Sequence, residues 1–440
     1  MKRKIYNQLI EWKNNTNRKP LMVLGVRQCG KTYIIEEFCK NEYKKYCTIN
    51  LFERVEIINL YKNENINSEE KYKQLKSIIN FDFDDPDTIL FIDEIQESEE
   101  LISDLKFMCE KHNNVNIICA GSLLGVKLKR MTKSFPVGKI WMLNMYPMDF
   151  EEYLMAFDEN MLLDYIKECF KKNKPMGVLH EKAMYYYRNY MITGGMPESV
   201  FNMVQIKNDY INYDKRIITT IINSYFNDMK KHVKNLKEAL KIRNIYDSLP
   251  NQLSNSSHKF QFSKINKNAK TRDYENPLDW LISSNMVLRV NSITNPQKPL
   301  KGFENKNVFK LFFSDIGILN NILNVNMIDI LQDNLEIYKG VLSENFVATQ
   351  LVSNDILVFY WKSKEDAEVV FLIETTNDGV IPIEVKSSEN TQSKSLKVYN
   401  KRYKPNYMIR ISSKDFGYNS ESKIKSIPLY ATFLIKELTK

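Results

Sequence analysis

The stretch LMVLGVRQCGKT at residues 21–32 decides the fold of the N-terminal part of this chain. It matches the pattern G-x-x-x-x-G-K-[ST] at every fixed position, between an apolar run and a helical pattern, as this motif requires. Gly25 and Gly30 let successive backbone N–H groups point at a β-phosphate, aided by the helix N-terminus behind them. Lys31 is placed to reach the β- and γ-phosphates, and the Thr32 hydroxyl to bind Mg²⁺. We therefore expect ATP and Mg²⁺ as ligands. The predicted cradle is Gly25, Val26, Arg27, Gln28, Cys29, Gly30, Lys31 and Thr32.

A second acidic motif follows about sixty residues later. The strand-like run TILFIDEI at 88–95 contains Asp93 and Glu94 after four apolar residues. A carboxylate at the C-terminal edge of a buried strand is where Mg²⁺ is held, so Asp93 is expected to bind the metal through water. Glu94 is expected to polarise the water that attacks the γ-phosphate. The alternative is an Asp-Glu pair at a solvated strand end.

The next strand-like run, NVNIICAGS at 114–122, brings Ser122 beside Asp93 if the two strands are neighbours. Ser122 would then sense the γ-phosphate or orient water, or it would cap the following helix. Arg27 could contact phosphate, and Arg130 and Lys139 are candidates for a transition-state cation. For Cys29 we expect the role of a small side chain that fits the loop.

The alternation of strand and helix patterns over residues 21–145 predicts a parallel α/β sheet, so the fold class is α/β with an N-terminal P-loop NTPase domain. We expect this domain at residues 1–150, a helical lid or linker at 151–235, a winged-helix-like domain at 236–330 and an α/β domain at 331–440. The segment DWLISSNMVLRVNSI at 279–293 predicts a helix followed by a strand. DILVFYW, EVVFLIE, VIPIEVK, YMIRIS and PLYATFL predict strands in the closing domain.

Composition narrows the class of protein. Hydrophobic residues make up 43% of 440 residues, which is typical of a globular protein with a sizeable core. A net charge of +9 is compatible with a DNA partner but is a mild excess. Six cysteines without a CxxC pair favour reduced thiols in the cytoplasm. No apolar run approaches the roughly 18 residues of a membrane span, so no membrane partner is expected.

Taken together, several motifs resemble a large prokaryotic family of AAA-type ATPases with a C-terminal nuclease-like domain of unknown function. They are GVRQCGKT, LFIDEIQ, AGSLLGV, YPMDFEEYL at 146–154, YMITGGMPESV at 190–200, FKLFFSDIGIL at 309–319, GVLSENFVATQL at 340–351 and IPIEVKSS at 381–388. The match spans nearly the whole chain. The resemblance implies a helical lid and a winged-helix-like module in the middle.

The family's closing domain resembles the PD-(D/E)xK nuclease fold, in which three acidic positions and a lysine hold a divalent metal. Glu344 fits the first acidic position, and Glu384 with Lys386 fits the E-x-K pattern. Val370 stands where the pattern requires an aspartate, and an apolar residue does not bind metal. Glu368 lies on the same strand face and is a partial substitute. We expect a degenerate, binding or structural domain rather than an active nuclease.

Two further motifs lie between these domains. Gly194-Gly195-Met196-Pro197 predicts either a hinge that couples nucleotide state to the lid or a plain turn between helices. Asp315 is expected to cap the helix that begins at Ile316. The run at 230–234 with Lys237 and Lys241 offers either a phosphate-contacting face or a solvated helix face.

The leading hypothesis is an Mg²⁺-dependent ATPase whose P-loop domain drives conformational change and acts on nucleic acid or a protein partner. The alternatives are a nucleotide-switched DNA-binding or scaffolding protein with little turnover, and an ATP-gated nuclease. A homo-oligomer is compatible with the sequence.

Overall fold

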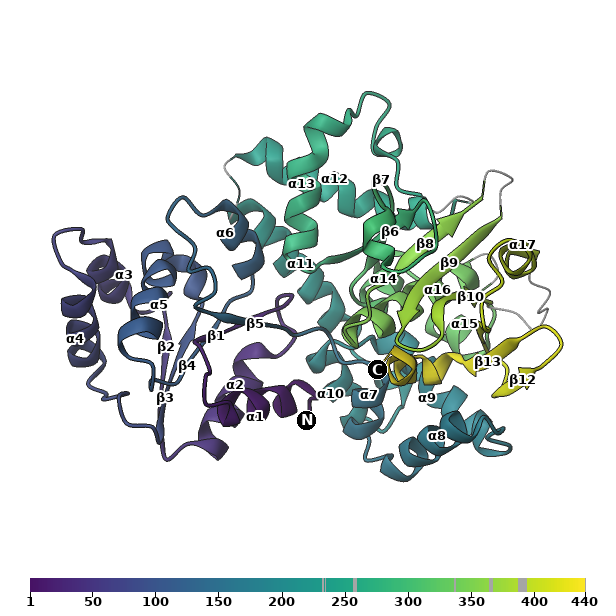
Figure 1. Ribbon diagram of the computed structural model, residues 1–440, viewed down its shortest axis with the longest axis horizontal. Coiled ribbons are helices and arrows are strands. Elements are labelled where there is room, and N and C mark those ends of the chain that lie inside the picture. Colours follow the sequence, from purple (N-terminus) through teal and green to yellow (C-terminus); the bar gives the residue numbers. More distant parts are fainter. Residues whose placement is uncertain are drawn as a thin grey trace. The chain divides into compact units, whose positions relative to one another are not determined.

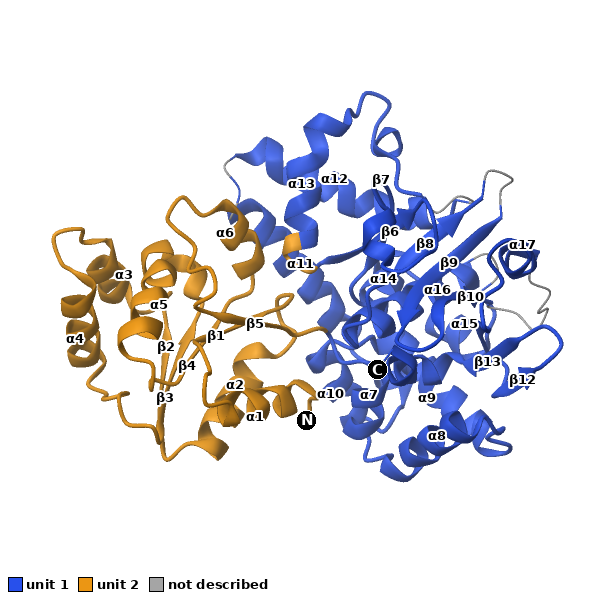
Figure 2. Ribbon diagram, in the orientation of Figure 1, with its two compact units in different colours: residues 1, 147–282, 286–440 blue, residues 2–146, 283–285 orange. Residues whose placement is uncertain are grey.

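The computed structural model describes residues 1–231, 233, 235–255, 259–335, 338–363, 367–386 and 394–439. The chain forms two compact units (Figure 2). The N-terminal unit comprises residues 2–146 with 283–285, and the C-terminal unit comprises residues 147–282 and 286–440 with Met1.

The N-terminal unit is built on a parallel sheet of five strands in the order β2-β3-β4-β1-β5. The strands are β1 (Leu21–Leu24), β2 (Lys45–Asn50), β3 (Thr88–Asp93), β4 (Ile117–Ala120) and β5 (Trp141–Asn144). The helices are α1 (Ile5–Asn14), α2 (Lys31–Glu42), α3 (Val55–Lys62), α4 (Ser68–Ile79), α5 (Glu99–Lys111) and α6 (Leu124–Arg130), with a 3₁₀ turn η1 (Ile95–Glu97). Every residue of β3 and β4 is buried, as expected when helices cover both faces of a parallel sheet (Figure 1). The predicted P-loop α/β fold is confirmed.

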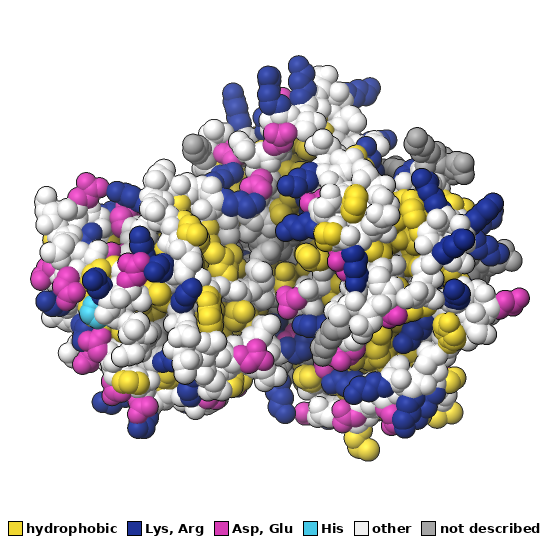
Figure 3. Space-filling model, viewed as in Figure 1, with side chains coloured by type: hydrophobic (Ala, Val, Ile, Leu, Met, Phe, Trp, Pro, Cys, Tyr) yellow, Lys and Arg dark blue, Asp and Glu magenta, His cyan; other side chains and the backbone are white. Residues whose placement is uncertain are grey.

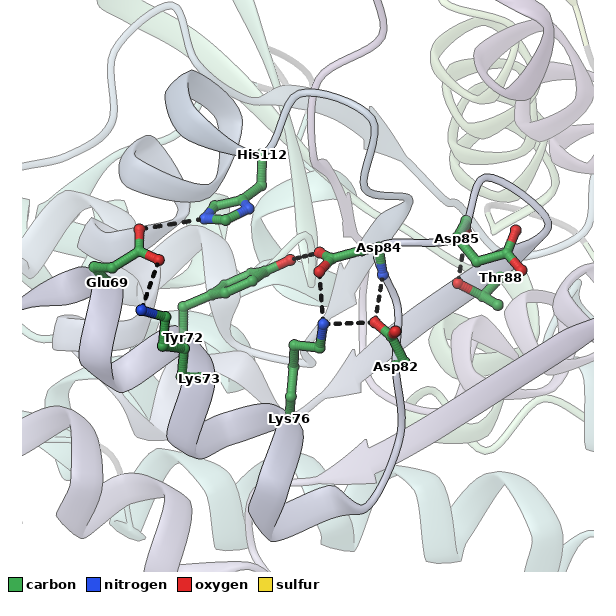
Figure 4. A network of polar contacts seen from close by, with 9 residues as sticks. All are labelled: Glu69, Tyr72, Lys73, Lys76, Asp82, Asp84, Asp85, Thr88 and His112. Carbon is green, nitrogen blue, oxygen red and sulfur yellow. Dashed lines mark hydrogen bonds and ion pairs between the residues drawn. The ribbon is translucent and has the colours of Figure 1, made fainter.

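Charged side chains organise the connection between α4 and β3 (Figure 4). Lys76 on α4 forms ion pairs with Asp82 Oδ1 at 2.6 Å and Asp84 Oδ2 at 2.5 Å. The Tyr72 hydroxyl also donates to Asp84, and its ring stacks on His112 at 3.9 Å between centroids. These contacts hold the segment that leads into β3, the strand with the acidic motif.

The C-terminal unit begins with helices and continues into a mixed sheet. The helical part contains α7 (Phe150–Ala156), α8 (Asn160–Lys172), α9 (Leu179–Thr193), α10 (Pro197–Gln205), η2 (Tyr210–Asn212), α11 (Arg216–Lys231), α12 (Leu236–Leu253), η3 (Phe262–Lys264) and α13 (Thr271–Ser283). The later helices are α14 (Ile316–Ile322), α15 (Met327–Leu331), α16 (Tyr338–Ser353), α17 (Lys394–Tyr403) and α18 (Lys436–Thr439), with η4 (Leu300–Phe303) and η5 (Leu429–Ile435). Local capping explains several of these starts: Asp149 and Glu152 form a capping box at α7, and Asn235 caps α12.

Eight strands form one sheet in the order β12-β13-β11-β10-β9-β8-β6-β7. They are β6 (Val287–Ile293), β7 (Glu304–Phe313), β8 (Phe359–Lys362), β9 (Glu368–Thr375), β10 (Gly379–Val385), β11 (Met408–Ser412), β12 (Gly417–Asn419) and β13 (Ile424–Pro428). The hairpin β6–β7 follows α12 and α13, and β6 also pairs in parallel with β8, so the winged-helix-like module stays a prediction. The expected boundaries at residues 235 and 330 therefore both fall inside this one unit.

One strand prediction is wrong. PLYATFL at 428–434 was expected to be a strand, but residues 429–435 form the 3₁₀ helix η5, and the strand β13 ends at Pro428. All seven residues of η5 are buried, and η5 packs against α16. A short apolar run that is buried on all sides has no period that separates strand from helix.

Asp315 caps α14 as predicted, because its Oδ1 accepts from the N–H of Ile318 at 3.0 Å. Its other oxygen, Oδ2, accepts from the N–H of Gly195 at 2.6 Å. Gly194, with φ of 64°, ends α9, and a Cβ there would lie 2.2 Å from Asp315 Oδ1. The glycine pair therefore forms a turn between α9 and α10 that is held by this buried carboxylate.

Candidate nucleotide site

Two glycines shape the loop between β1 and α2. Gly30 has φ of 91°, a left-handed conformation that favours glycine, and it stands directly before the first residue of α2. A Cβ on Gly25 would lie 2.2 Å from the carbonyl oxygen of Met145, just after β5. The loop therefore needs glycine at both positions that the motif fixes.

Lys31 is the first residue of α2, and its side chain curls back into the loop. Its Nζ donates to the carbonyl oxygens of Gly25 at 2.8 Å and Val26 at 2.9 Å, and the residue is 7% exposed. The Nζ also lies 3.9 Å from the Cys29 Sγ. An ammonium held by such neutral partners can exchange them for phosphate oxygens, which carry full negative charge. Lys31 Nζ therefore lies inside the loop that Gly25 and Gly30 shape.

Thr32 and Asp93 meet although 61 residues separate them. The Thr32 hydroxyl donates to Asp93 Oδ2 at 2.7 Å. Burial raises the pKa of Asp93, the bond from Thr32 opposes this, and the charge of Glu94 raises the pKa further. A bound cation would favour the charged form of this carboxylate. The hydroxyl and the carboxylate thus offer neighbouring oxygen atoms of the kind that Mg²⁺ prefers.

Glu94 follows Asp93 in a left-handed backbone conformation, with φ of 55°. Its N–H donates to Asp93 Oδ1 at 2.9 Å, so the turn after β3 closes on the carboxylate itself. The side-chain amide of Gln96 donates to Glu94 Oε2. Glu94 is half-buried rather than fully solvated, and it lies next to Asp93 as the sequence predicts.

Ser122 follows β4, which lies between β3 and β1 in the sheet. The strand that ends at Asp93 and the strand before Ser122 are therefore neighbours, as the prediction for Ser122 requires. The alternative role as a helix cap is wrong, because the N-cap of α6 is Leu123, with no side-chain cap bond. The role of Ser122 at the γ-phosphate stays a prediction.

The candidate cations differ in their surroundings. Lys139 forms an ion pair with Glu110 at 2.9 Å, so its charge already has a partner. Arg27 and Arg130 are half-buried, and their roles at phosphate stay predictions. Cys29 is fully buried, and its Sγ lies 3.6 Å from the Met145 carbonyl oxygen, which fits a small side chain packed inside the loop.

Sequence reasoning missed Arg3. Its guanidinium donates to the carbonyl oxygen of Cys29 at 2.9 Å and to that of Tyr146 at 2.7 Å, and the residue is buried. One side chain therefore links the phosphate loop to the segment after β5. These partners lie 26 and 143 residues away, so no local pattern could have revealed the contact.

In the C-terminal unit, Glu384 and Lys386 are brought together, with Lys386 Nζ 2.7 Å from Glu384 Oε1. Burial raises the pKa of Glu384, and the charges of Lys386 and Arg410 oppose this. Arg410 is the register partner of Glu384 on β11. The buried carboxylate therefore lies among cations of the protein.

The other expected ligands do not complete a metal site. Ile383 pairs with Phe371, so buried Val370 is next in register to Glu384. Glu368, the suggested substitute, instead forms an ion pair with the fully buried Lys310. Glu344 is buried on α16. Among the residues that the structure describes, no three His, Cys, Asp or Glu side chains are grouped to hold a metal.

Comparison with known families agrees with the N-terminal geometry. Residues 17–154 match an AAA domain. The chain carries an AAA-type ATPase domain. Residues 184–329 and 339–431 match two domains of unknown function, DUF8612 and DUF4143. Nucleotide binding follows from the AAA domain together with its P-loop.

A relative with similar extent is the uncharacterized protein MJ1544 of Methanocaldococcus jannaschii. It is 24% identical over 429 residues, which cover 96% of this chain and 86% of that protein. Weak structural similarity extends to Drosophila ORC bound to DNA, with 12% identity, TM-score 0.29, and coverage of 73% of this chain and 94% of that chain. It extends also to the Aeropyrum pernix ORC2 protein, with 13% identity, TM-score 0.30, and coverage of 76% of this chain and 92% of that chain. Within the described residues, no helix is long and apolar enough to span a membrane.

Proposed function

We propose that this protein is an Mg²⁺-dependent ATPase. The observation that carries the proposal is the contact of 2.7 Å between the Thr32 hydroxyl and Asp93, beside a lysine buried inside the phosphate loop. A strand-end carboxylate next to a loop hydroxyl is the arrangement that holds Mg²⁺ against ATP phosphates.

Mg²⁺ would be held by Thr32 directly and by Asp93 through water, and when bound it neutralises charge on the β- and γ-phosphates. Lys31 would leave the carbonyl oxygens of Gly25 and Val26 and bind the phosphate oxygens. The N–H groups of the loop and of the first turn of α2 would bind the β-phosphate.

Glu94 would accept a proton from the water that attacks the γ-phosphorus. The new bond forms between the water oxygen and phosphorus, and the bond from phosphorus to the β–γ bridging oxygen breaks, giving ADP and phosphate. The proton moves to the Glu94 carboxylate. Support for this role comes from the position of Glu94, one residue after Asp93 and half-buried.

The test is phosphate release from ATP by the purified full chain, with Mg²⁺ or with excess EDTA. We expect turnover with Mg²⁺ only, and a loss of at least 100-fold in Lys31→Ala. Lys40→Ala is the matched control, because Lys40 is an exposed lysine near the end of the same helix. Equal turnover in Lys31→Ala and wild type would overturn the proposal.

A specific surface favours nucleic acid as the partner. The basic segment, residues 259–272, contains five cations and no acidic residue: Lys259, Lys264, Lys267, Lys270 and Arg272. All five are exposed, and none forms an ion pair with a described residue. Figure 3 shows Lys and Arg side chains gathered at the top of the view, where Figure 1 places the connection between α12 and α13.

The basic segment has an anchored backbone. The ring of Phe260 stacks on that of Phe309 at 5.5 Å between centroids, and the N–H of Phe260 donates to the Phe309 carbonyl oxygen. Asn266 donates from Nδ2 to the Tyr274 hydroxyl at 3.0 Å. These cations, on an anchored backbone, suit a polyanionic partner, because little conformational freedom is lost on binding.

The other predicted basic run, residues 230–234, is described only in part, because His232 and Lys234 lie outside the described residues.

A further inference from the structure

Gln96 lies in η1, directly after the strand that carries Asp93 and Glu94. The residue is 4% exposed, and its side-chain amide Nε2 donates to Glu94 Oε2. A hydrogen bond from a buried amide to a carboxylate fixes the orientation of the carboxylate. Glu94 is therefore held by one of its two oxygens.

Gly121, just after β4, makes room for this amide. A Cβ on Gly121 would lie 1.8 Å from Oε1 of Gln96 and 3.0 Å from its Cδ. Any side chain at position 121 would displace the carboxamide group. The segments that follow β3 and β4 thus approach each other at Gln96 and Gly121.

Packing alone does not explain a glutamine at this position. Oε1 of Gln96 is buried and has no hydrogen-bond partner among the described residues. A buried acceptor without a partner destabilises the fold, whereas methionine would fill the same space without that penalty. The feature of glutamine that methionine lacks and the structure uses is the N–H donor to Glu94.

We propose that Gln96 is a positioning residue for ATP hydrolysis. It holds Glu94 Oε2, which leaves Oε1 of Glu94 to accept the proton of the attacking water. Glu94 needs such support, because a half-buried glutamate has several rotamers and only one orientation suits the proton transfer. This inference rests on the ATPase function proposed above.

The first test compares ATP turnover in Gln96→Met with wild type. We expect kcat to fall by about 10- to 100-fold, with KM for ATP within about twofold, since misplacing one catalytic group costs up to about 100-fold. Gln96→Glu keeps the shape but has no N–H to donate at pH 8, so kcat should fall at least as far. The matched control is Gln74→Met, because Gln74 also donates to a glutamate, Glu70, at 3.0 Å on the exposed face of α4.

The second test is a double-mutant cycle with Gly121→Ala. A methyl group at position 121 should displace the Gln96 carboxamide and lower kcat. Added to Gln96→Ala, which has no carboxamide left to displace, Gly121→Ala should cause no further loss. Thermal unfolding midpoints confirm that each variant is folded.

Two outcomes would overturn the inference while the ATPase function stands. One is wild-type kcat in a folded Gln96→Met protein. The other is an equal loss from Gly121→Ala with and without the Gln96 carboxamide, which would place the effect in β4. Absence of turnover in wild type would instead overturn the ATPase function itself, and the inference with it.

Discussion

At the scale of single residues, Asp315 combines complete burial with a negative charge. Burial raises its pKa to about 6, and backbone N–H groups of Gly195, Ile318 and Gly317 oppose this by binding the charged form. The unfolded value is about 3.9. The folded protein therefore holds the proton more tightly than the unfolded chain between about pH 4 and pH 6. The stability that this proton contributes is fully present below pH 4 and is lost as pH rises through 6.

We predict that Asp315→Asn removes this pH dependence. A shift of about two pKa units corresponds to about 3 kcal/mol. The difference in free energy of unfolding, wild type minus Asp315→Asn, should fall by up to about 3 kcal/mol between pH 4 and pH 7. Urea unfolding of both proteins over this range measures it, with Asp209→Asn, an exposed capping carboxylate, as the control variant. A difference that stays constant with pH would show that Asp315 is not protonated in the folded state at pH 4–6.

The residues of the site were predictable to different extents. Lys31 and Thr32 belong to a motif whose spacing is local, and Asp93 stands at the end of an unmistakable buried strand. Gln96 is only three residues from Asp93 and forms part of LFIDEIQ, but its role depends on Gly121, which lies on another strand connection. Arg3 likewise acts on residues that are distant in the sequence. Such contacts depend on the order of the strands in the sheet, which cannot be predicted from one sequence alone.

At the scale of elements, the basic segment gives a prediction about DNA binding. Lys264→Gln, Lys267→Gln and Lys270→Gln together should weaken binding to a duplex. They should also lower the slope of log K against log salt by up to about 2.7, since each phosphate contact contributes about 0.9. Fluorescence anisotropy of a labelled duplex at several salt concentrations measures both quantities.

The control removes the same charge elsewhere in the C-terminal unit. Lys172, Lys174 and Lys182 all form ion pairs with glutamates, and changing these three to Gln should leave the slope unchanged. Equal effects from the two triple variants would mean that total charge, and not the basic segment, drives binding. A wild-type protein without affinity for any duplex would turn the search toward a protein partner.

Elements with a clear hydrophobic period or a capping residue could be predicted from the sequence, whereas an element without either could not. The strand of residues 88–93 and the helix capped by Asp315 were both expected. PLYATFL was expected to be a strand, but six of its seven residues lie in the buried 3₁₀ helix η5, where no face is left polar, and Pro428 ends β13. The parallel pairing of β6 with β8 joins segments about 70 residues apart, and only the folded sheet reveals it.

At the scale of the whole molecule, the chain combines a P-loop unit with a larger unit in which no three His, Cys, Asp or Glu side chains among the described residues are grouped to hold a metal. The N-terminal unit holds every residue that ATP hydrolysis requires in this account: Lys31, Thr32, Asp93, Glu94 and Gln96. The C-terminal unit retains Glu384 and Lys386 but surrounds them with Val370 and Arg410. The proposed ATP hydrolysis therefore involves only residues of the N-terminal unit.

The most direct test of the ATPase account separates ATP binding from hydrolysis in Glu94→Gln. A fluorescent ATP analogue and a phosphate sensor report both steps in one sample with Mg²⁺. We expect ATP affinity within about threefold of wild type and phosphate release at least about 100-fold slower, because general-base catalysis contributes about 10²–10⁴-fold. Glu97→Gln, a change in the same 3₁₀ turn, should behave as wild type. Phosphate release at the wild-type rate in Glu94→Gln would contradict the account.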